Sequence, residues 1–204
     1  MKVMVIGVGG VGSWCAEALL RGGVTELTLV DGDTVERSNL NRQCEATAAT
    51  LGRLKVEAMR ERLLAIEPAA EVVALARRYP FADGAADMGG FDFVVDAIDS
   101  VADKAELILE ATARGIPIVS SMGAALRTDP TAVRLERFDR IAGDALARAL
   151  RQRFKRLGRY PAAKFFCAVS GEPAGDAAAG RWSRMTVTAT FGLTLAAAVL
   201  AARK

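Results

Sequence analysis

The chain has 204 residues, a length that predicts one α/β domain and is ample for a buried core. Apolar residues make up 51% of it and charged residues 25%, which excludes a disordered or collagen-like chain. Histidine is absent, which excludes histidine-dependent triads, histidine-ligated zinc and imidazole general bases. Any chemistry must therefore use Asp, Glu, Lys, Arg, Cys or a bound cofactor.

The cysteines and the amino terminus indicate a reducing compartment. Cys15, Cys44 and Cys167 are odd in number and isolated, which argues against a disulfide framework and against a cysteine-only zinc site. The first ten residues lack the basic region, long apolar stretch and cleavage site of a secretory signal. We therefore expect a cytoplasmic protein.

Strands and helices alternate over the first 120 residues. The apolar run 2–6 predicts a strand, glycines follow at 7–12, and the helical pattern of 13–21 ends at Gly22-Gly23. By the same reasoning we expect strands at 26–30, 71–75, 91–95 and 116–120, and helices at 51–66, stopped by Pro68, and 103–114. This order predicts an α/β fold with a Rossmann-like, doubly wound and mostly parallel sheet, whose ligands bind at the carboxyl ends of the strands.

The alternation weakens after residue 120. We expect a strand at 133–137, a basic helix at 144–157 and a mobile loop at 170–184. The uncharged run 185–202 reaches the lower limit of a membrane span, but threonines dilute it, so we favour a buried strand-helix pair closing the core and consider membrane contact the alternative. The prediction is a single domain over 1–204, with a Rossmann-like core at 1–122 and a substrate-side C-terminal extension at 123–204.

A glycine motif follows the first predicted strand. Gly7, Gly9 and Gly12 satisfy G-x-G-x-x-G between a strand and a helix, where free amide groups and the helix dipole favour a phosphate. Asp31 ends the second strand, where a carboxylate can accept both hydrogen bonds of a ribose diol. These two features alone favour an NAD-dependent oxidoreductase, and a tight turn without a ligand is the alternative.

The residues after Asp31 favour a triphosphate instead. Arg37, Arg42 and Lys55 lie within one loop and one helical turn of the predicted nucleotide site, and a triphosphate needs cations near its β and γ groups. Each base taken singly is more simply a solvated surface charge, but their position at the strand ends favours the phosphate role.

The combined motifs resemble the ThiF/MoeB/HesA adenylating enzymes, relatives of ubiquitin-activating enzymes. The segments that carry the likeness are Gly7-x-Gly9-Gly10-x-Gly12, Leu29-Val30-Asp31-x-Asp33-x-Val35, Ser38-Asn39-Leu40-Asn41-Arg42-Gln43, Gly52-x-x-Lys55 and Asp96-Ala97-Ile98-Asp99. The resemblance implies ATP as the nucleotide, cradled by the glycines, with Asp31 on the ribose. It further implies Asn39, Arg42 and Lys55 on the phosphates and Asp99 on magnesium. Arg42, Lys55 and Asp99 would then be the catalytic residues.

Within that family the chain is similar to the tRNA threonylcarbamoyladenosine dehydratase branch. The matching segments are Gly12-Ser13-Trp14, Glu17-Ala18-Leu19, Asp99-Ser100-Val101, Lys104-Ala105, Thr128-Asp129-Pro130-Thr131, Cys167-x-x-Ser170-x-Glu172-Pro173 and Thr190-Phe191-Gly192. The likeness implies adenylation of the carboxylate of N6-threonylcarbamoyladenosine in tRNA, followed by cyclisation, and a homodimer. The alternatives are adenylation of the C-terminus of a sulfur-carrier or ubiquitin-like protein, and a non-catalytic NAD- or nucleotide-binding module.

Two departures from the family pattern stand out. The family places a helical segment with an Arg before the first strand, and this chain begins at the strand. The zinc-binding cysteine pairs of the MoeB-like branch are also absent, which disfavours a sulfur-carrier activator of that type. Cys167 is either an acyl acceptor or a small buried hydrophobe, and an isolated Cys is more often the latter.

Seven bases and no acid occupy residues 148–164, at positions Arg148, Arg151, Arg153, Lys155, Arg156, Arg159 and Lys164. We expect this segment to dock the tRNA backbone while the loop 170–184 covers the site. A solvated helix face is the alternative.

Overall fold

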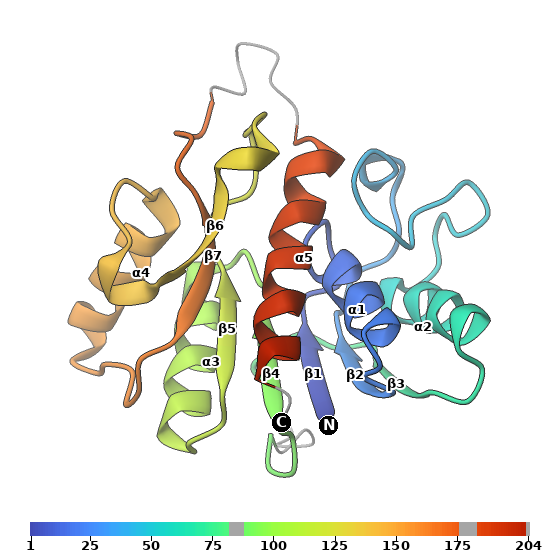
Figure 1. Cartoon of the computed structure of the whole chain (residues 1–204), viewed down its shortest axis with the longest axis horizontal. Coiled ribbons are helices and arrows are strands. Elements are labelled where there is room, and N and C mark those ends of the chain that lie inside the picture. Colours follow the sequence, from blue (N-terminus) through green and yellow to red (C-terminus); the bar gives the residue numbers. More distant parts are fainter. Residues whose placement is uncertain (82–87, 176–182, 203–204) are drawn as a thin grey trace.

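In the computed structural model, which describes residues 1–81, 88–175 and 183–202, a seven-stranded sheet forms the centre of the molecule (Figure 1). The strand order is β3-β2-β1-β4-β5-β7-β6, and β6 alone runs antiparallel, against β7. The strands are β1 (Lys2–Ile6), β2 (Glu26–Val30), β3 (Glu71–Leu75), β4 (Phe93–Asp96), β5 (Ile118–Ser121), β6 (Val133–Arg137) and β7 (Phe166–Ser170). The predicted α/β, doubly wound and mostly parallel sheet is confirmed.

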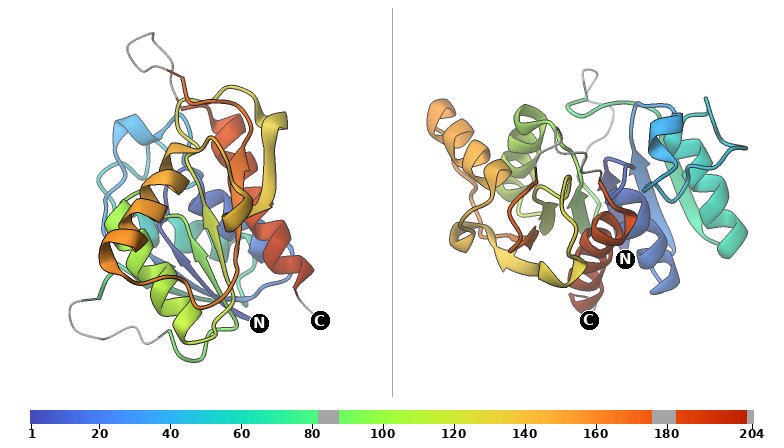
Figure 2. Two further views of the ribbon diagram at one scale, coloured as in Figure 1. Left: turned by 90° about the vertical axis from the view of Figure 1, so that its left-hand side faces the viewer. Right: turned by 90° about the horizontal axis from the view of Figure 1, so that it is seen from above.

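Helices cover both faces of the sheet (Figure 2). The helices are α1 (Gly12–Arg21), α2 (Lys55–Ile66), α3 (Val101–Ala113), α4 (Ala145–Leu157) and α5 (Met185–Ala201). One buried cluster joins side chains of α1, α2 and α5 to the sheet, and a second joins those of α3 and α4. The central strands are therefore buried on both sides, which explains their near-continuous apolar sequences.

Helix α5 corrects the expectation for residues 185–202. It is one continuous helix and not a strand-helix pair, and it packs along α1. A Cβ at Gly192 would lie 2.4 Å from the carbonyl oxygen of Val11, so glycine is what allows the two backbones to approach. Among the described residues, the structure contains no helix with the length and apolarity needed to cross a membrane.

Strand β7 was not predicted, and it carries Cys167 into the core between β5 and β6. The expected loop 170–184 therefore begins with the last residue of a strand, and its positions 176–182 lie outside the described residues. The start of the expected helix 51–66 is also wrong. Gly52 has φ +78° and residue 54 bridges to Thr34, so the chain turns before α2 begins at Lys55.

Other boundaries differ by two residues at most. Helix α2 ends at Ile66 because Glu67 is extended before Pro68, as proline requires of the residue preceding it. Helix α3 spans Val101–Ala113 where 103–114 was expected. Helix α4 follows Asp144, whose side chain accepts a hydrogen bond from the Ala147 amide and caps the helix, as the predicted boundary implied.

Candidate nucleotide site

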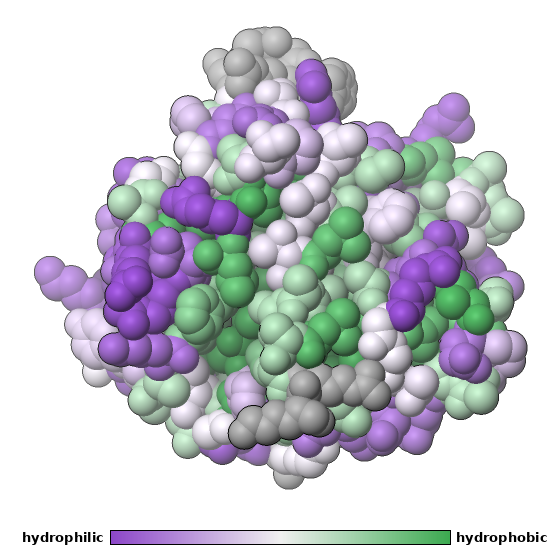
Figure 3. All heavy atoms as spheres, viewed as in Figure 1, coloured by the Kyte–Doolittle hydropathy of each residue, from purple (hydrophilic) through white to green (hydrophobic). Residues whose placement is uncertain are grey.

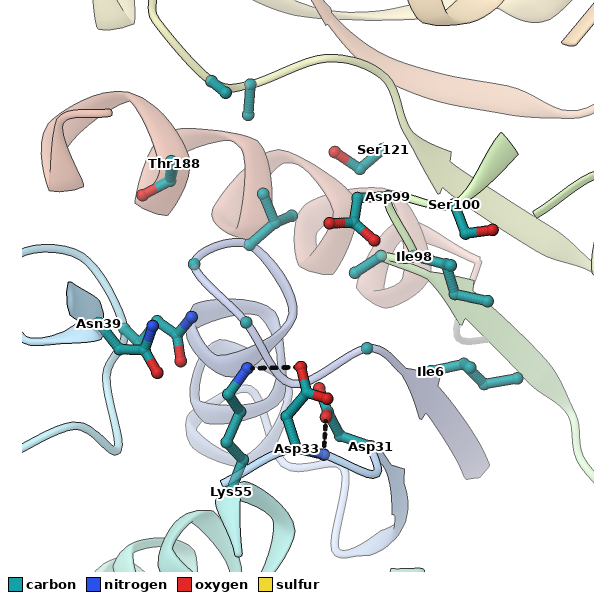
Figure 4. Close-up of a pocket in the computed structure, with 18 of the residues that line it drawn as sticks. Ile6, Asp31, Asp33, Asn39, Lys55, Ile98, Asp99, Ser100, Ser121 and Thr188 are labelled. Carbon is teal, nitrogen blue, oxygen red and sulfur yellow. Dashed lines mark hydrogen bonds and ion pairs between the residues drawn. The ribbon is translucent and has the colours of Figure 1, made fainter. Parts of the chain in front are cut away.

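A cavity of about 620 Å³ lies at the carboxyl ends of β1, β2, β4 and β5 (Figure 4). It sits where the chain leaves β1 toward α1 on one face of the sheet and leaves β4 toward α3 on the other. Such a switch point is where doubly wound folds bind their ligands, and the volume falls within the range of about 300–1,000 Å³ typical of small-molecule sites.

The glycine loop forms one wall of this cavity, and its glycines have different tasks. Gly7 has φ +90°, and a Cβ there would lie 2.6 Å from the carbonyl oxygen of Ala97. Gly9 and Gly10 line the cavity, where a side chain would intrude on a ligand. Gly12 does not line it, and a Cβ there would lie 1.8 Å from the Gly7 carbonyl oxygen. Gly12 therefore closes the turn, and its predicted contact with the nucleotide stays a prediction.

Asp31 lies where the sequence predicts it, directly after β2 and facing the cavity. Its Oδ2 accepts the amide of Val8 at 2.8 Å, and its Oδ1 accepts the amide of Asp33 at 2.8 Å. These bonds fix the carboxylate against the glycine loop. Each oxygen still has a free lone pair, which suits the hydroxyls of a ribose.

Lys55, at the start of α2, is buried and points into the cavity beside Asp33 (Figure 4). Its Nζ lies 3.2 Å from Asp33 Oδ2, while Arg78 Nη2 lies 2.6 Å from Asp33 Oδ1. Burial acts to raise the pKa of Asp33, but the hydrogen bonds and charges of Lys55 and Arg78 outweigh it and hold that pKa below its ordinary value. Lys55, Asp33 and Arg78 thus form a row of alternating charges, and the Asp33 carboxylate holds the Lys55 ammonium group at the cavity wall.

Arg42 also lines the cavity, in the segment between β2 and α2. The indole Nε1 of Trp14 donates to the Arg42 carbonyl at 2.9 Å, which ties this segment to α1. Arg42 Nη1 donates to the Ser38 carbonyl and to Asn41 Oδ1, both at 2.8 Å. Nε and Nη2 have no partner within the described part of the chain, so a phosphate could take them.

Asn39 is a buried part of the same wall. Its Oδ1 accepts the Glu36 amide at 2.9 Å in a reciprocal capping arrangement, and its Nδ2 lies 3.3 Å from Ser38 Oγ. Asn39 thus shapes the turn as well as facing the cavity. Arg37, which the sequence also suggested, is exposed and does not line the cavity.

Asp99 approaches the cavity from the side opposite Lys55, on the turn between β4 and α3 (Figure 4). It is exposed, and over residues 1–81, 88–175 and 183–202 its carboxylate has no hydrogen-bond or ion-pair partner. The next residue, Ser100, caps α3 by accepting the Asp103 amide. Across the described chain, the structure shows no group of three Cys, Asp or Glu side chains able to hold a metal unaided.

Several other residues of the cavity wall were not predicted from the sequence. They comprise Arg77, Arg78 and Tyr79 after β3, the segment 121–125 at the end of β5, Leu146 of α4 and Thr188 of α5. The rule that placed Asp31 and Asp99 at strand ends applies equally after β3 and β5, so that signal was available. Leu146 and Thr188 follow only from long-range packing.

Cys167 is fully buried in β7, and burial raises its pKa far above the ordinary thiol value. It does not line the cavity. The structure therefore supports the small buried hydrophobe and not the acyl acceptor. Cys15 and Cys44 are also buried.

Comparisons with known proteins show which family the chain resembles. Residues 1–200 match the ThiF family. The tRNA threonylcarbamoyladenosine dehydratase of Bacillus subtilis is 41% identical over 162 residues, which are 76% of this chain and 62% of that protein. The molybdopterin-synthase adenylyltransferase of Escherichia coli is 38% identical over 128 residues, 63% of this chain and 51% of that protein.

A solved structure matches nearly the whole chain. The crystal structure of E. coli tRNA N6-threonylcarbamoyladenosine dehydratase in complex with ATP superposes with a TM-score of 0.90 at 36% identity, covering 98% of this chain and 84% of that one. The chain spans about three fifths of the length of the curated dehydratases that it matches.

The sequence match and the structural superposition indicate the same family of proteins. The expected resemblance to the ThiF family, including that to the tRNA threonylcarbamoyladenosine dehydratases, is confirmed. The glycine loop, Asp31, Arg42 and Lys55 line one cavity, and their roles toward a nucleotide stay predictions. The chain belongs to the ThiF family.

Proposed function

We propose that this chain binds ATP and transfers its adenylyl group to the carboxylate of N6-threonylcarbamoyladenosine in tRNA, which then cyclises with loss of water. The observation that carries the proposal is a cavity lined together by the glycine loop, Arg42, Lys55 and Asp99. The likeness over 98% of the chain to a dehydratase solved with ATP supports the same nucleotide.

The cavity has the features that ATP requires. Gly9 and Gly10 leave room for a phosphate against the first turn of α1, where amide groups and the helix dipole attract an anion. Asp31 is rigid and has acceptor capacity left for a ribose. Arg42 and Lys55 supply positive charge that the two phosphates of NAD would not require.

The chain's part in adenylation is positioning and charge neutralisation. A carboxylate oxygen of the substrate forms a bond to the α-phosphorus, and the bond from that phosphorus to the bridging oxygen breaks to release pyrophosphate. Arg42 and Lys55 stabilise the charge that gathers on the phosphate oxygens, so the step needs no side-chain nucleophile. An intramolecular nucleophile of the substrate then displaces AMP and closes the ring.

Asp99 is the residue that we propose for magnesium. A lone exposed carboxylate facing the cavity suits this ion, which proteins usually hold by one or two carboxylates together with substrate phosphates. When bound, magnesium neutralises charge on the leaving pyrophosphate. Asp99 would orient it, while Lys55 holds the opposite side of the phosphate chain.

The basic segment 148–164 is our proposed contact for the tRNA backbone, with 123–204 as the substrate side of the domain. Arg151 is committed elsewhere, because it donates to the carbonyls of Phe138 and Ile141, and Arg159 pairs with Glu106 at 2.9 Å. Arg148, Lys155 and Arg156 are exposed and better suited to phosphates. Leu146, in the first turn of the same helix, lines the cavity, so α4 begins at the site.

We also infer a homodimer and a cytoplasmic site of action. Apolar side chains gather over α5 and the neighbouring strands on one face (Figure 3), where Leu135 and Leu193 are exposed and a second copy would cover them. Light scattering on the wild type and on Leu193→Glu tests the dimer. The cytoplasmic site of action is inferred from the proposed tRNA substrate.

Adenylation of a carrier protein's C-terminus is the second candidate, because the molybdopterin-synthase adenylyltransferase matches 63% of the chain. The deciding experiment digests tRNA bearing N6-threonylcarbamoyladenosine to nucleosides, after incubation with the chain, ATP and magnesium. We expect a nucleoside lighter by one water, with AMP formed in equal amount. An unchanged nucleoside would contradict the dehydratase proposal.

A further inference from the structure

Three polar side chains form a closed cluster beneath the cavity, at the end of β4. Asp96, Lys104 and Ser120 each have no solvent exposure. Lys104 Nζ lies 2.7 Å from Asp96 Oδ2 and 3.2 Å from Ser120 Oγ, and Ser120 Oγ donates to the same carboxylate oxygen at 2.6 Å. Strands β4 and β5 and helix α3 each supply one member. The Cα atoms of Ser120 and Cys167 are paired in the parallel β5-β7 ladder.

Stability alone is a weak reason for such a cluster. Removing two charges from water costs several kcal/mol per ion, and well-packed apolar residues often serve as well or better. A buried ion pair instead fixes one arrangement of the segments that carry it, because every alternative leaves a charge unpaired in the core. The segments joined here include the turn that presents Asp99.

The other oxygen of Asp96 controls that turn. Asp96 Oδ1 accepts the amide of Ile98 at 3.1 Å, and the Ala97 amide donates to the Ile6 carbonyl at 2.8 Å. The Ala97 carbonyl lies so close to Gly7 that a Cβ there would be 2.6 Å away. The turn is therefore held between the buried cluster below and the glycine loop beside it, and Asp99 is its next residue.

We propose that Lys104 and Ser120 are positioning residues that act through Asp96 to set the place of Asp99 relative to the glycine loop. This inference rests on the proposed adenylation and on the part given there to Asp99. Neither side chain touches the nucleotide cavity. Their effect on the reaction passes through one carboxylate and the backbone of residues 96–99.

Ser120→Ala tests the proposal, because it removes one hydroxyl and keeps the buried ion pair. We expect kcat for ATP–pyrophosphate exchange to fall about tenfold, while the KM for ATP changes less than about twofold, since a displaced Asp99 loses its contact only as pyrophosphate leaves. Calorimetric affinity for ATP, with or without magnesium, should likewise stay within twofold of wild type.

Thr112→Val is the matched control. Thr112 is also buried, its hydroxyl donates to the Ile108 carbonyl within α3, and it does not line the cavity. Its loss should lower the melting temperature without changing kcat. Lys104→Met combined with Asp96→Asn supplies a second variant that leaves no unpaired buried charge, and kcat should fall there as well.

Two readouts separate positioning from general destabilisation. In an Asp99→Asn background Ser120→Ala should lower kcat no further, because both changes act through the same contact. The Ile98 amide should also exchange hydrogen at least tenfold faster in Ser120→Ala than in wild type, with or without ATP. Full additivity in the double variant, or unchanged exchange at Ile98, would overturn the inference. Faster exchange at Ile98 in a chain whose wild type shows no ATP chemistry would overturn the proposed function alone.

Discussion

The ammonium group of Lys55 lies 3.2 Å from the carboxylate of Asp33, although 22 positions separate them in the chain. The pair places a buried positive charge on the wall of the nucleotide cavity, and Arg78 neutralises the carboxylate from its other side. A phosphate that enters the cavity can therefore also bind Lys55, because Arg78 still neutralises the negative charge of Asp33.

Lys55→Ala and Arg42→Ala should each weaken ATP binding or turnover by about tenfold or more. Charge-assisted hydrogen bonds contribute roughly 1.5–3 kcal/mol, and about 1.4 kcal/mol corresponds to tenfold. Isothermal calorimetry with ATP and with NAD measures the effect and the preference. Arg53→Ala is the control, because Arg53 pairs with Glu61 and does not line the cavity. Tight binding of NAD by the wild type with none of ATP would contradict the assignment.

Asp99→Asn should lose activity in a way that raised magnesium partly restores. The amide keeps the shape of the side chain but lacks the charge that holds an oxygen-ligated divalent ion. The apparent magnesium activation constant is the quantity to measure, at fixed ATP. If the activity of the variant followed pH and ignored magnesium, Asp99 would act as an acid or base and the metal role would be wrong.

Replacing Arg148, Lys155 and Arg156 together by Glu should raise the KM for tRNA and flatten the salt dependence of tRNA binding. Each lost phosphate contact reduces the slope of log K against log salt by about one. Affinity for ATP should not change, since these side chains do not line the cavity.

A triple charge reversal elsewhere controls for net charge. Arg21, Arg53 and Arg114 are exposed bases outside the cavity, and each forms an ion pair with a glutamate. Their replacement by Glu should affect tRNA binding far less. Equal losses in the two triple variants would mean that net charge, and not a docking surface on α4, governs the affinity.

Glu45 should make the fold less stable as pH rises. Its side chain is buried, and burial raises its pKa to about 7, an effect that a backbone hydrogen bond, the charge of Lys55 and the Ser13 hydroxyl offset only in part. Between an unfolded pKa near 4.5 and this folded value, the native state holds a proton that the unfolded state has released. Stability is therefore highest below that window and falls through it.

Urea unfolding of Glu45→Gln at pH 4.5 and pH 8 measures this contribution. The variant should lack a decrease of about 2–3 kcal/mol that the wild type shows, since one pKa unit corresponds to about 1.4 kcal/mol. Glu61→Gln, at an exposed position, should behave as the wild type does. The same pH slope in Glu45→Gln and in the wild type would show that Glu45 is ionised in the folded state.

Local sequence signals were sufficient for β1 to β5 and for the helices between them. Those strands are apolar runs, of which β1, β2 and β4 end at glycine or aspartate. Parallel pairing brings the strand ends to one edge of the sheet, so the sequence predicts the places of Asp31 and Asp99. Local signals do not predict strand β7, because the residues with which it pairs in β5 and β6 lie 29 to 47 positions earlier and its own five residues carry no pattern. Helix α5 was misread because its outward side is also apolar.

The chemistry of the site was less accessible than its location. The motif spacing predicts that Arg42 and Lys55 lie at the same site, and both line the cavity. It does not predict that Asp33 and Arg78 hold Lys55 in place. Nor does it predict the hydrogen bond from Trp14 to the Arg42 carbonyl. Such contacts depend on side-chain geometry between segments distant in the chain. For the same reason, the sequence does not predict that Lys104 and Ser120 are the buried partners of Asp96.

Exchange of labelled pyrophosphate into ATP, with and without tRNA bearing N6-threonylcarbamoyladenosine, measures directly whether the chain adenylates this substrate. Exchange requires that a carboxylate attack the α-phosphorus reversibly, so it reports adenylation whatever follows. We expect exchange that depends on this tRNA and is at least tenfold weaker in Lys55→Ala. Binding of ATP without any exchange in the presence of the modified tRNA would contradict it and leave a nucleotide-binding module.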